Sequence, residues 1–223
     1  MSGKLALRTL CMALGVIVVT ACQHAPVDHA QSQAEAAKNS SNTVSIPYEK
    51  YTLENGLTVI LHEDHSDPLV HVDVTYHVGS AREDVGKSGF AHFFEHLLFE
   101  GTENIDRGEW FNIVAANGGS NNANTTQDRT YYYETFPSNN LKLGLWMESE
   151  RMLHPVINEV GVETQNEVVK EEKRSRIDNA PYGKIIYSTG INKYVFDKHP
   201  YKNSVIGTME DLDAAELDEF KAF

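Results

Sequence analysis

Two histidines and a glutamate lie within five consecutive residues, at a spacing that suits metal-dependent hydrolysis. The segment reads His92-Phe93-Phe94-Glu95-His96. On a helix, residues four apart project from the same face, so His92 and His96 can bind one ion. Two imidazoles suit zinc, whose catalytic sites take three protein ligands and leave one position open. Glu95 borders the same face, where a carboxylate can take the proton of a zinc-activated water.

The neighbours of this segment favour a metal site over an ordinary pair of histidines. A five-residue pattern also arises by chance, and a single histidine is usually a surface or core residue with ordinary partners. Burying imidazoles and a carboxylate costs free energy unless they are paired or coordinate an ion. The apolar residues around them are Phe90, Phe93, Phe94, Leu97, Leu98 and Phe99.

The flanking elements predict an α+β fold, an antiparallel sheet packed by helices on one side. Asn55-Gly56 predicts a hairpin between strands at 48–53 and 57–62, and alternation predicts a strand at 70–76. The run at 130–135 is also typical of a strand. Strands followed by paired helices indicate this layered arrangement rather than a doubly wound sheet. The predicted helices cover 90–99, 107–116, 160–177 and 211–223, and another opens at Pro137-Ser138 and continues through Met152. Residues 187–196 are ambiguous, with turn residues before them favouring a new helix start.

The N-terminus has the pattern of a bacterial lipoprotein signal peptide. Lys4 and Arg8 precede an apolar run at 10–19 that is short for a membrane span. Val19-Thr20-Ala21-Cys22 resembles a lipobox, in which Cys22 is lipidated after cleavage. An uncleaved anchor helix is the alternative. We therefore expect a signal peptide at 1–21.

The residues after Cys22 predict a flexible tether and a place at the outer membrane. Residues 22–45 are rich in Ala, Gln, Ser and Asn and lack periodic apolar positions. Gln23, rather than Asp, follows the lipidated position and favours outer-membrane sorting. We expect an exported protein, held by its lipid at the periplasmic face of a bacterial outer membrane.

Composition excludes two other classes of protein. The 223 residues carry 19 Lys and Arg against 32 Asp and Glu, a formal net charge of −13, which argues against nucleic acid as a partner. The two cysteines, Cys11 and Cys22, both lie in the N-terminal segment, which excludes a disulfide framework or a cysteine zinc site in the folded part. Any metal there has to be held by His and carboxylate side chains.

From Gly89 to Thr102 the sequence resembles the zinc-binding signature of the pitrilysin/insulinase family, whose motif is H-x-x-E-H. The resemblance extends over nearly all of residues 46–223. It implies that this stretch is an N-terminal metallopeptidase domain with one zinc ion per chain. His92 and His96 would be ligands and Glu95 the general base.

The same resemblance implies a third ligand on a later helix. Matching the family's Val-Val-x-x-Glu pattern places that ligand at Glu172, with Glu171 as the rival if the register slips by one residue. Relatives often carry a supporting acidic residue two helical turns earlier. Gln165 occupies that place here, and so the chain departs from the family pattern. Apart from the resemblance, this stretch reads as a solvated charged helix.

Residues 116–125 also resemble the family, in which this region forms an edge strand near the zinc. We expect Asn122, Ala123 and Asn124 to bind the backbone of an extended peptide substrate. Without the resemblance, the same stretch reads equally as a polar loop. His71 and His77 alternate on the predicted strand at 70–76 and are expected to be structural or solvated.

These observations together predict a zinc-dependent metalloendopeptidase that hydrolyses peptide bonds in peptides or unfolded chains. Relatives enclose the substrate between two homologous halves, which implies a second half or subunit as a partner. The helix at 211–223 matches the middle of a family domain, so we expect the domain at 46–223 to be truncated at its C-terminus. The alternative is a truncated or non-catalytic subunit that binds zinc or peptide and needs a partner half.

Overall fold

The computed structural model describes residues 45–187 and 190–223. The chain divides into two compact units, and the division falls between Glu63 and Asp64. The predicted signal peptide at 1–21, the lipidation site Cys22 and all but the last residue of the predicted tether at 22–45 lie outside the described residues. Within the described part of the chain, no helix is long and apolar enough to span a membrane.

The described part of the first unit is a β-hairpin, as the Asn-Gly pair predicts. Strands β1 (Glu49–Thr52) and β2 (Thr58–Leu61) pair antiparallel. Gly56 turns the chain with a φ of 90°, which glycine adopts without steric cost. The side chain of Asn55 accepts a hydrogen bond from the backbone N–H of Leu57 at 3.1 Å.

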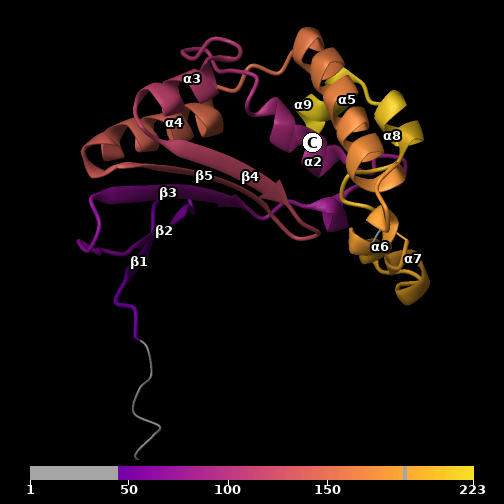
Figure 1. The fold of residues 1–223 in the computed structure, drawn as a ribbon, viewed down its shortest axis with the longest axis horizontal. Coiled ribbons are helices and arrows are strands. Elements are labelled where there is room, and N and C mark those ends of the chain that lie inside the picture. Colours follow the sequence, from indigo (N-terminus) through magenta and orange to yellow (C-terminus); the bar gives the residue numbers. More distant parts are fainter. Residues whose placement is uncertain (1–44, 188–189) are drawn as a thin grey trace, which may run out of the picture. The chain divides into compact units, whose positions relative to one another are not determined.

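The second unit contains a three-stranded antiparallel sheet of order β3-β5-β4 (Figure 1). Its strands are β3 (Leu69–Tyr76), β4 (Ser120–Thr125) and β5 (Thr130–Pro137). Burial alternates along β5, so one face of the sheet is buried and the other is partly exposed. Because β5 is central, β4 lies at one edge of this sheet.

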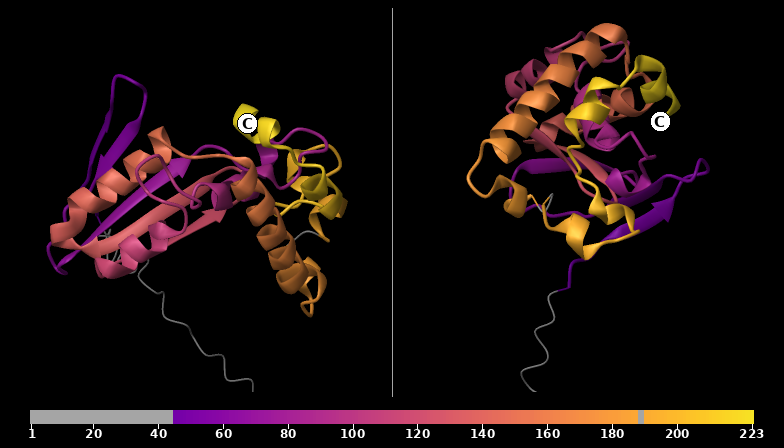
Figure 2. Two further views of the ribbon diagram at one scale, coloured as in Figure 1. Left: turned by 90° about the horizontal axis from the view of Figure 1, so that it is seen from above. Right: turned by 90° about the vertical axis from the view of Figure 1, so that its right-hand side faces the viewer.

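Helices pack against the buried face of the sheet. Helix α4 (Leu141–Leu153) packs on β3 and β5, and α3 (Glu109–Ala116) packs on β4. Figures 1 and 2 show both helices on the same face. This arrangement confirms the α+β prediction. The core between them is formed by Ile105, Trp110, Val114, Phe136 and Met147.

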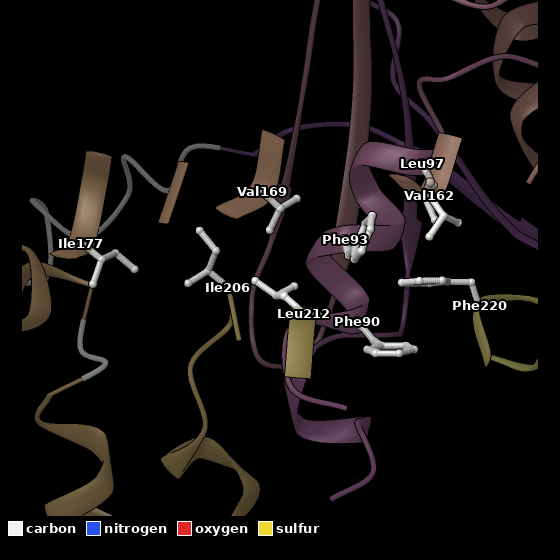
Figure 3. Close-up of a cluster of buried hydrophobic side chains, with 9 residues drawn as sticks. All are labelled: Phe90, Phe93, Leu97, Val162, Val169, Ile177, Ile206, Leu212 and Phe220. Atoms are coloured by element: carbon white, nitrogen blue, oxygen red, sulfur yellow. The ribbon is translucent and has the colours of Figure 1, made fainter. Parts of the chain in front are cut away.

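A second core joins the helix that carries the histidine motif to later helices. Helix α2 (Phe90–Leu97) packs against α5 (Glu159–Lys173), which continues as a π-helical turn over Arg174–Asp178. Figure 3 shows the side chains that fill the contact. They are Phe90, Phe93, Leu97, Val162, Val169, Ile177, Ile206, Leu212 and Phe220.

The C-terminal part of the described chain departs from prediction in one respect. Instead of one helix at 211–223, there are two, α8 (Met209–Asp213) and α9 (Leu217–Ala222). Glu216 causes the break, because its side chain caps α9 while Glu219 bonds back to the backbone N–H of Glu216. The ambiguous segment contains the one-turn helix α7 (Asn192–Val195), preceded by another one-turn helix, α6 (Gly183–Ile186).

A buried ionic network lies between β5, α4 and the end of α2. Arg151 is fully buried and donates to Glu134 and Glu148, each at 3.1 Å, and to the carbonyl oxygen of Leu98 at 3.0 Å. Burial, with Glu148 adding to it, raises the pKa of Glu134 to about 9. The network therefore ties the last turn of α2 to the sheet. Three aromatic rings enclose the guanidinium: Phe99, Trp110 and Tyr132.

Candidate metal centre

The start of α2 is fixed by a close backbone contact and by a half-buried carboxylate. Gly89 precedes the helix with a φ of 94°, and a Cβ at this position would lie 2.7 Å from the carbonyl oxygen of Ile206. Glu83 accepts hydrogen bonds from the backbone N–H of Gly89 at 3.0 Å and of Ala91 at 2.9 Å. These bonds satisfy N–H groups that the helix itself leaves unpaired. A carboxylate is also favoured beside the positive end of a helix.

The opposite faces of α2 have opposite roles. Its apolar face is buried in the core drawn in Figure 3. His92, Glu95 and His96 therefore project from the other face, where they line a cavity of about 670 Å³. The spacing of four between the histidines brings their rings to a centroid distance of 4.8 Å. The helix predicted from the sequence thus places all three polar side chains together.

Glu172 reaches the two histidines from α5. Its Oε2 lies 3.6 Å from Nε2 of His92 and 3.3 Å from Nε2 of His96. Ligands at the usual zinc distance of about 2 Å and tetrahedral angles lie ~3.3 Å from one another. The three donor atoms are all within 4.8 Å of each other, so small side-chain adjustments suffice for one ion. Two imidazoles and one carboxylate are also a donor set that zinc accepts.

The rival third ligand points elsewhere. Glu171 is 70% exposed at its side chain and forms an ion pair with Arg174 at 3.2 Å. The Oε1 atom of Glu172, by contrast, is held by Arg176 at 2.6 Å, which leaves Oε2 facing the histidines. The geometry therefore favours Glu172 over Glu171 as the third ligand.

Burial and charge give the three side chains different pKa values. Burial lowers the pKa of His92 to about 4, and the neighbouring His96 adds to the shift. Burial also opposes charge on His96, but the hydrogen bond and charge of Glu172 outweigh it and raise the pKa of His96. Burial alone would raise the pKa of Glu172, yet the histidines and Arg176 together lower it. Without an ion, the centre thus favours a neutral His92 and an ionised Glu172, the forms that bind metal, whereas His96 favours its protonated form and has to release a proton when metal binds.

Glu95 is held at the side of this cluster by the edge strand. Its Oε2 accepts a hydrogen bond of 2.5 Å from the hydroxyl of Thr125, the last residue of β4. Burial raises the pKa of Glu95, although Thr125 and His96 oppose the shift. Sequence spacing does not distinguish Thr125, because its contact with Glu95 exists only when β4 packs beside α2.

The predicted substrate residues line the same cavity. Asn122, Ala123 and Asn124 form the middle of β4, and the Oδ1 of Asn122 accepts a hydrogen bond from the N–H of Ala123 at 2.9 Å. In the described residues, β4 pairs with β5 on one side only. The remaining wall is formed by apolar and polar side chains together; the larger apolar ones are Phe99, Phe111, Val168, Ile177 and Tyr187.

His71 and His77 lie outside this cavity. His71 contacts the hydroxyl of Thr135 at 2.9 Å, and His77 contacts Arg82 at 3.1 Å. Both histidines therefore have protein partners on or beside the sheet, in agreement with a structural role.

Comparison with known proteins places the chain in a family of peptidases. The profile of the insulinase family, peptidase family M16, matches residues 58–209. The zinc protease PqqE of Helicobacter pylori is 38% identical over 177 residues, which cover 79% of this chain and 39% of that protein. An uncharacterized zinc protease of Rickettsia bellii is 27% identical over 171 residues, 77% of this chain and 41% of that one. The chain belongs to the insulinase family, peptidase family M16.

Solved structures agree with this assignment. The crystal structure of a protease from Helicobacter pylori superposes with a TM-score of 0.76 at 36% identity, covering 80% of this chain and 42% of that chain. Pitrilysin shares the fold, with a TM-score of 0.69 at 21% identity over 82% of this chain and 20% of its own. The chain spans about two fifths of the length of the curated relatives named above.

We predict that Glu83 makes stability depend on pH. Burial raises its pKa from the usual 4.5 to about 7, with the charge of Asp211 adding to the shift. Between these values the folded protein binds a proton that the unfolded chain does not, so the free energy of unfolding falls as pH rises. Urea unfolding of the parent and Glu83→Gln, both with chelator, should show the parent losing stability relative to the variant from pH 4.5 to 7. A difference that stays constant or grows with pH would contradict this origin.

Proposed function

We propose that this chain is the metal-binding part of a zinc-dependent metalloendopeptidase. The observation that carries the proposal is the convergence of His92, His96 and Glu172 within 4.8 Å, with Glu95 beside them on the wall of one cavity. Relatives at 38% and 27% identity are named zinc proteases, which supports the same reaction class here. The proposed ligands are His92, His96 and Glu172.

The proposed chemistry divides between the ion and Glu95. Zinc, when bound, supplies Lewis-acid polarisation and lowers the pKa of the attacking water towards about 7. Thr125 holds one oxygen of Glu95, so Oε1 is positioned to accept the proton of that water. The same oxygen then returns the proton to the nitrogen of the leaving amine, as general acid–base catalysis requires. Arg176 keeps Glu172 oriented towards the two histidines during this cycle.

The proposed substrate is an extended peptide that adds a strand to the sheet at β4. The free edge of this strand borders the cavity that contains Glu95, and its middle residues Asn122, Ala123 and Asn124 have short side chains. A peptide bound in this way is recognised through its backbone, which suits cleavage of varied sequences. The N–H of Ala123 would exchange its bond to Asn122 for one to the substrate.

A second half is part of this proposal. One structural neighbour is described as the first half of the periplasmic protease PqqL of Escherichia coli, and it matches with a TM-score of 0.70 over 79% of this chain. This chain, whose proposed catalytic domain is residues 46–223, covers two fifths of the named relatives. The alternative function is a truncated or non-catalytic subunit that binds zinc or peptide and needs a partner half.

The proposed location is the periplasmic side of an outer membrane. The pattern at 1–21, lipidation at Cys22 and the tether at 22–45 carry this part of the proposal. A structural neighbour with a TM-score of 0.72, PqqL of Escherichia coli, is described as a periplasmic protease, which is consistent with export.

Glu95→Gln is expected to keep bound zinc and lose hydrolysis. The amide has the size of the carboxylate but cannot take a proton from water, so turnover of an unstructured peptide should fall by ~100-fold or more. Zinc content is measured by atomic absorption and turnover by peptide cleavage, for the chain alone and co-expressed with neighbouring genes. Glu171→Gln, the same change at an exposed carboxylate, is the control and should alter neither value.

Two outcomes of that experiment would overturn the proposal. Cleavage by Glu95→Gln at the parental rate would remove Glu95 as the base. Zinc binding by the parent without turnover in any combination would support the non-catalytic alternative.

Cys22→Ser is expected to release the chain from the membrane. Thioether attachment of lipid requires the cysteine sulfur, so the variant should leave the membrane fraction when cells are lysed. Mass spectrometry of the parent should find a lipid-modified N-terminal Cys22. An unmodified Cys22 in a mature chain would contradict lipid anchoring.

A further inference from the structure

His96 has a hydrogen-bond partner on the facing helix α5. Nδ1 of His96 lies 3.2 Å from Oε1 of Gln165, two helical turns before Glu172 on α5. In metal sites the second nitrogen of a ligating histidine commonly donates to a carboxylate, which fixes the ring and raises its basicity. A glutamine amide carries both a donor and an acceptor, so on its own it does not decide which end faces the ring.

A carboxylate, that of Glu100, lies behind Gln165 and is linked to His96 through it. Only 8% of Glu100 is exposed, and its Oε1 accepts a hydrogen bond from the side-chain amide of Gln165. Its Oε2 is bonded to the guanidinium of Arg107. An ionised carboxylate only accepts hydrogen bonds, and so the NH₂ group of Gln165 has to face Glu100.

We infer that Glu100, acting through Gln165, is a positioning residue for the proposed ligand His96. With the NH₂ group on Glu100, the Oε1 atom of Gln165 faces the imidazole and accepts from an N–H at Nδ1. Nε2, the nitrogen nearer Glu172, is then the one left for the metal. This inference rests on the proposed zinc site and goes beyond it by assigning a role to two further residues.

The arrangement is particular to one of the two histidines. Nδ1 of His92 is buried and has no hydrogen-bond partner among the described residues. The hydrogen bonds from Glu100 through Gln165 therefore orient His96, and the described residues offer no such bond to Nδ1 of His92. The two residues that orient His96 are therefore Glu100, which directly precedes Gly101, and Gln165 on the facing helix α5.

Exchanging the side chains of Glu100 and Gln165 distinguishes the orientation of His96 from a purely structural effect of Glu100. In Glu100→Gln, two amides face each other and either end of Gln165 can turn to His96, so zinc affinity should fall by ~10-fold or more. The double variant Glu100→Gln/Gln165→Glu places the carboxylate directly against His96 and should bring the affinity back near the parental value. Glu103→Gln, the same change at an exposed carboxylate, is the control and should have no effect.

Two measurements on the full chain test the inference. Zinc dissociation constants come from competition with a chromophoric chelator. The Nδ1–H proton of His96 is followed by NMR in zinc-free and zinc-loaded protein, and it should be protected from exchange in the parent and the double variant but not in Glu100→Gln. Because the zinc-free signal does not depend on metal binding, it tests the hydrogen bond even if the zinc site itself fails.

Unchanged affinity and protection in Glu100→Gln would overturn the inference. So would a double variant no better than Glu100→Gln. That second result would show that Glu100 acts only through its ion pair with Arg107, which both variants lose.

Discussion

The contact between α2 and α5 is the constraint on which the rest of the site depends. Each helix contributes proposed ligands from a polar face that borders a buried apolar face. Phe93 and Leu97 on α2 and Val162 and Val169 on α5 belong to one core, so its packing sets the separation between the histidines and Glu172. Interiors packed in this way resist deformation. The three donor atoms are thereby held close together although they come from distant parts of the chain.

Both ends of α2 are tied to the protein by ionisable side chains, one half-buried and one fully buried. Glu83 bonds the first backbone N–H groups, and Arg151 bonds the carbonyl oxygen of Leu98 just after the last turn. Burying such groups costs free energy, which good geometry and further hydrogen bonds offset. Arg151 meets that condition, with bonds to Glu134 and Glu148 as well. These bonds fix the position of α2 and its rotation about its own axis, and a metal centre requires both.

The sequence predicts those features of the site that are determined by residues close together in the chain. The pairing of His92 with His96 follows from helical spacing alone, and Asn55-Gly56 determines the hairpin turn. Glu172 needed the family resemblance, because nothing within its charged helix distinguishes it from Glu171. The geometry now separates the two through their contacts with the histidines and Arg174. Their role in binding metal stays a prediction.

Other features follow from tertiary contacts that sequence spacing does not encode. The sequence alone shows that Gln165 departs from the family pattern, but its contact with Glu100 exists only when α5 packs beside the end of α2. The division of the last predicted helix coincides with the capping box of α9, in which the side chains of Glu216 and Glu219 each accept from the other's backbone N–H. The signal peptide, Cys22 and the tether remain predictions.

The proposed zinc site is tested most directly by locating zinc in crystals of the zinc-loaded chain by anomalous diffraction at the zinc edge. We expect one peak, within about 2 Å of Nε2 of His92, Nε2 of His96 and a carboxylate oxygen of Glu172. A peak at Glu171, or one that contacts only one of the two histidines, would contradict it.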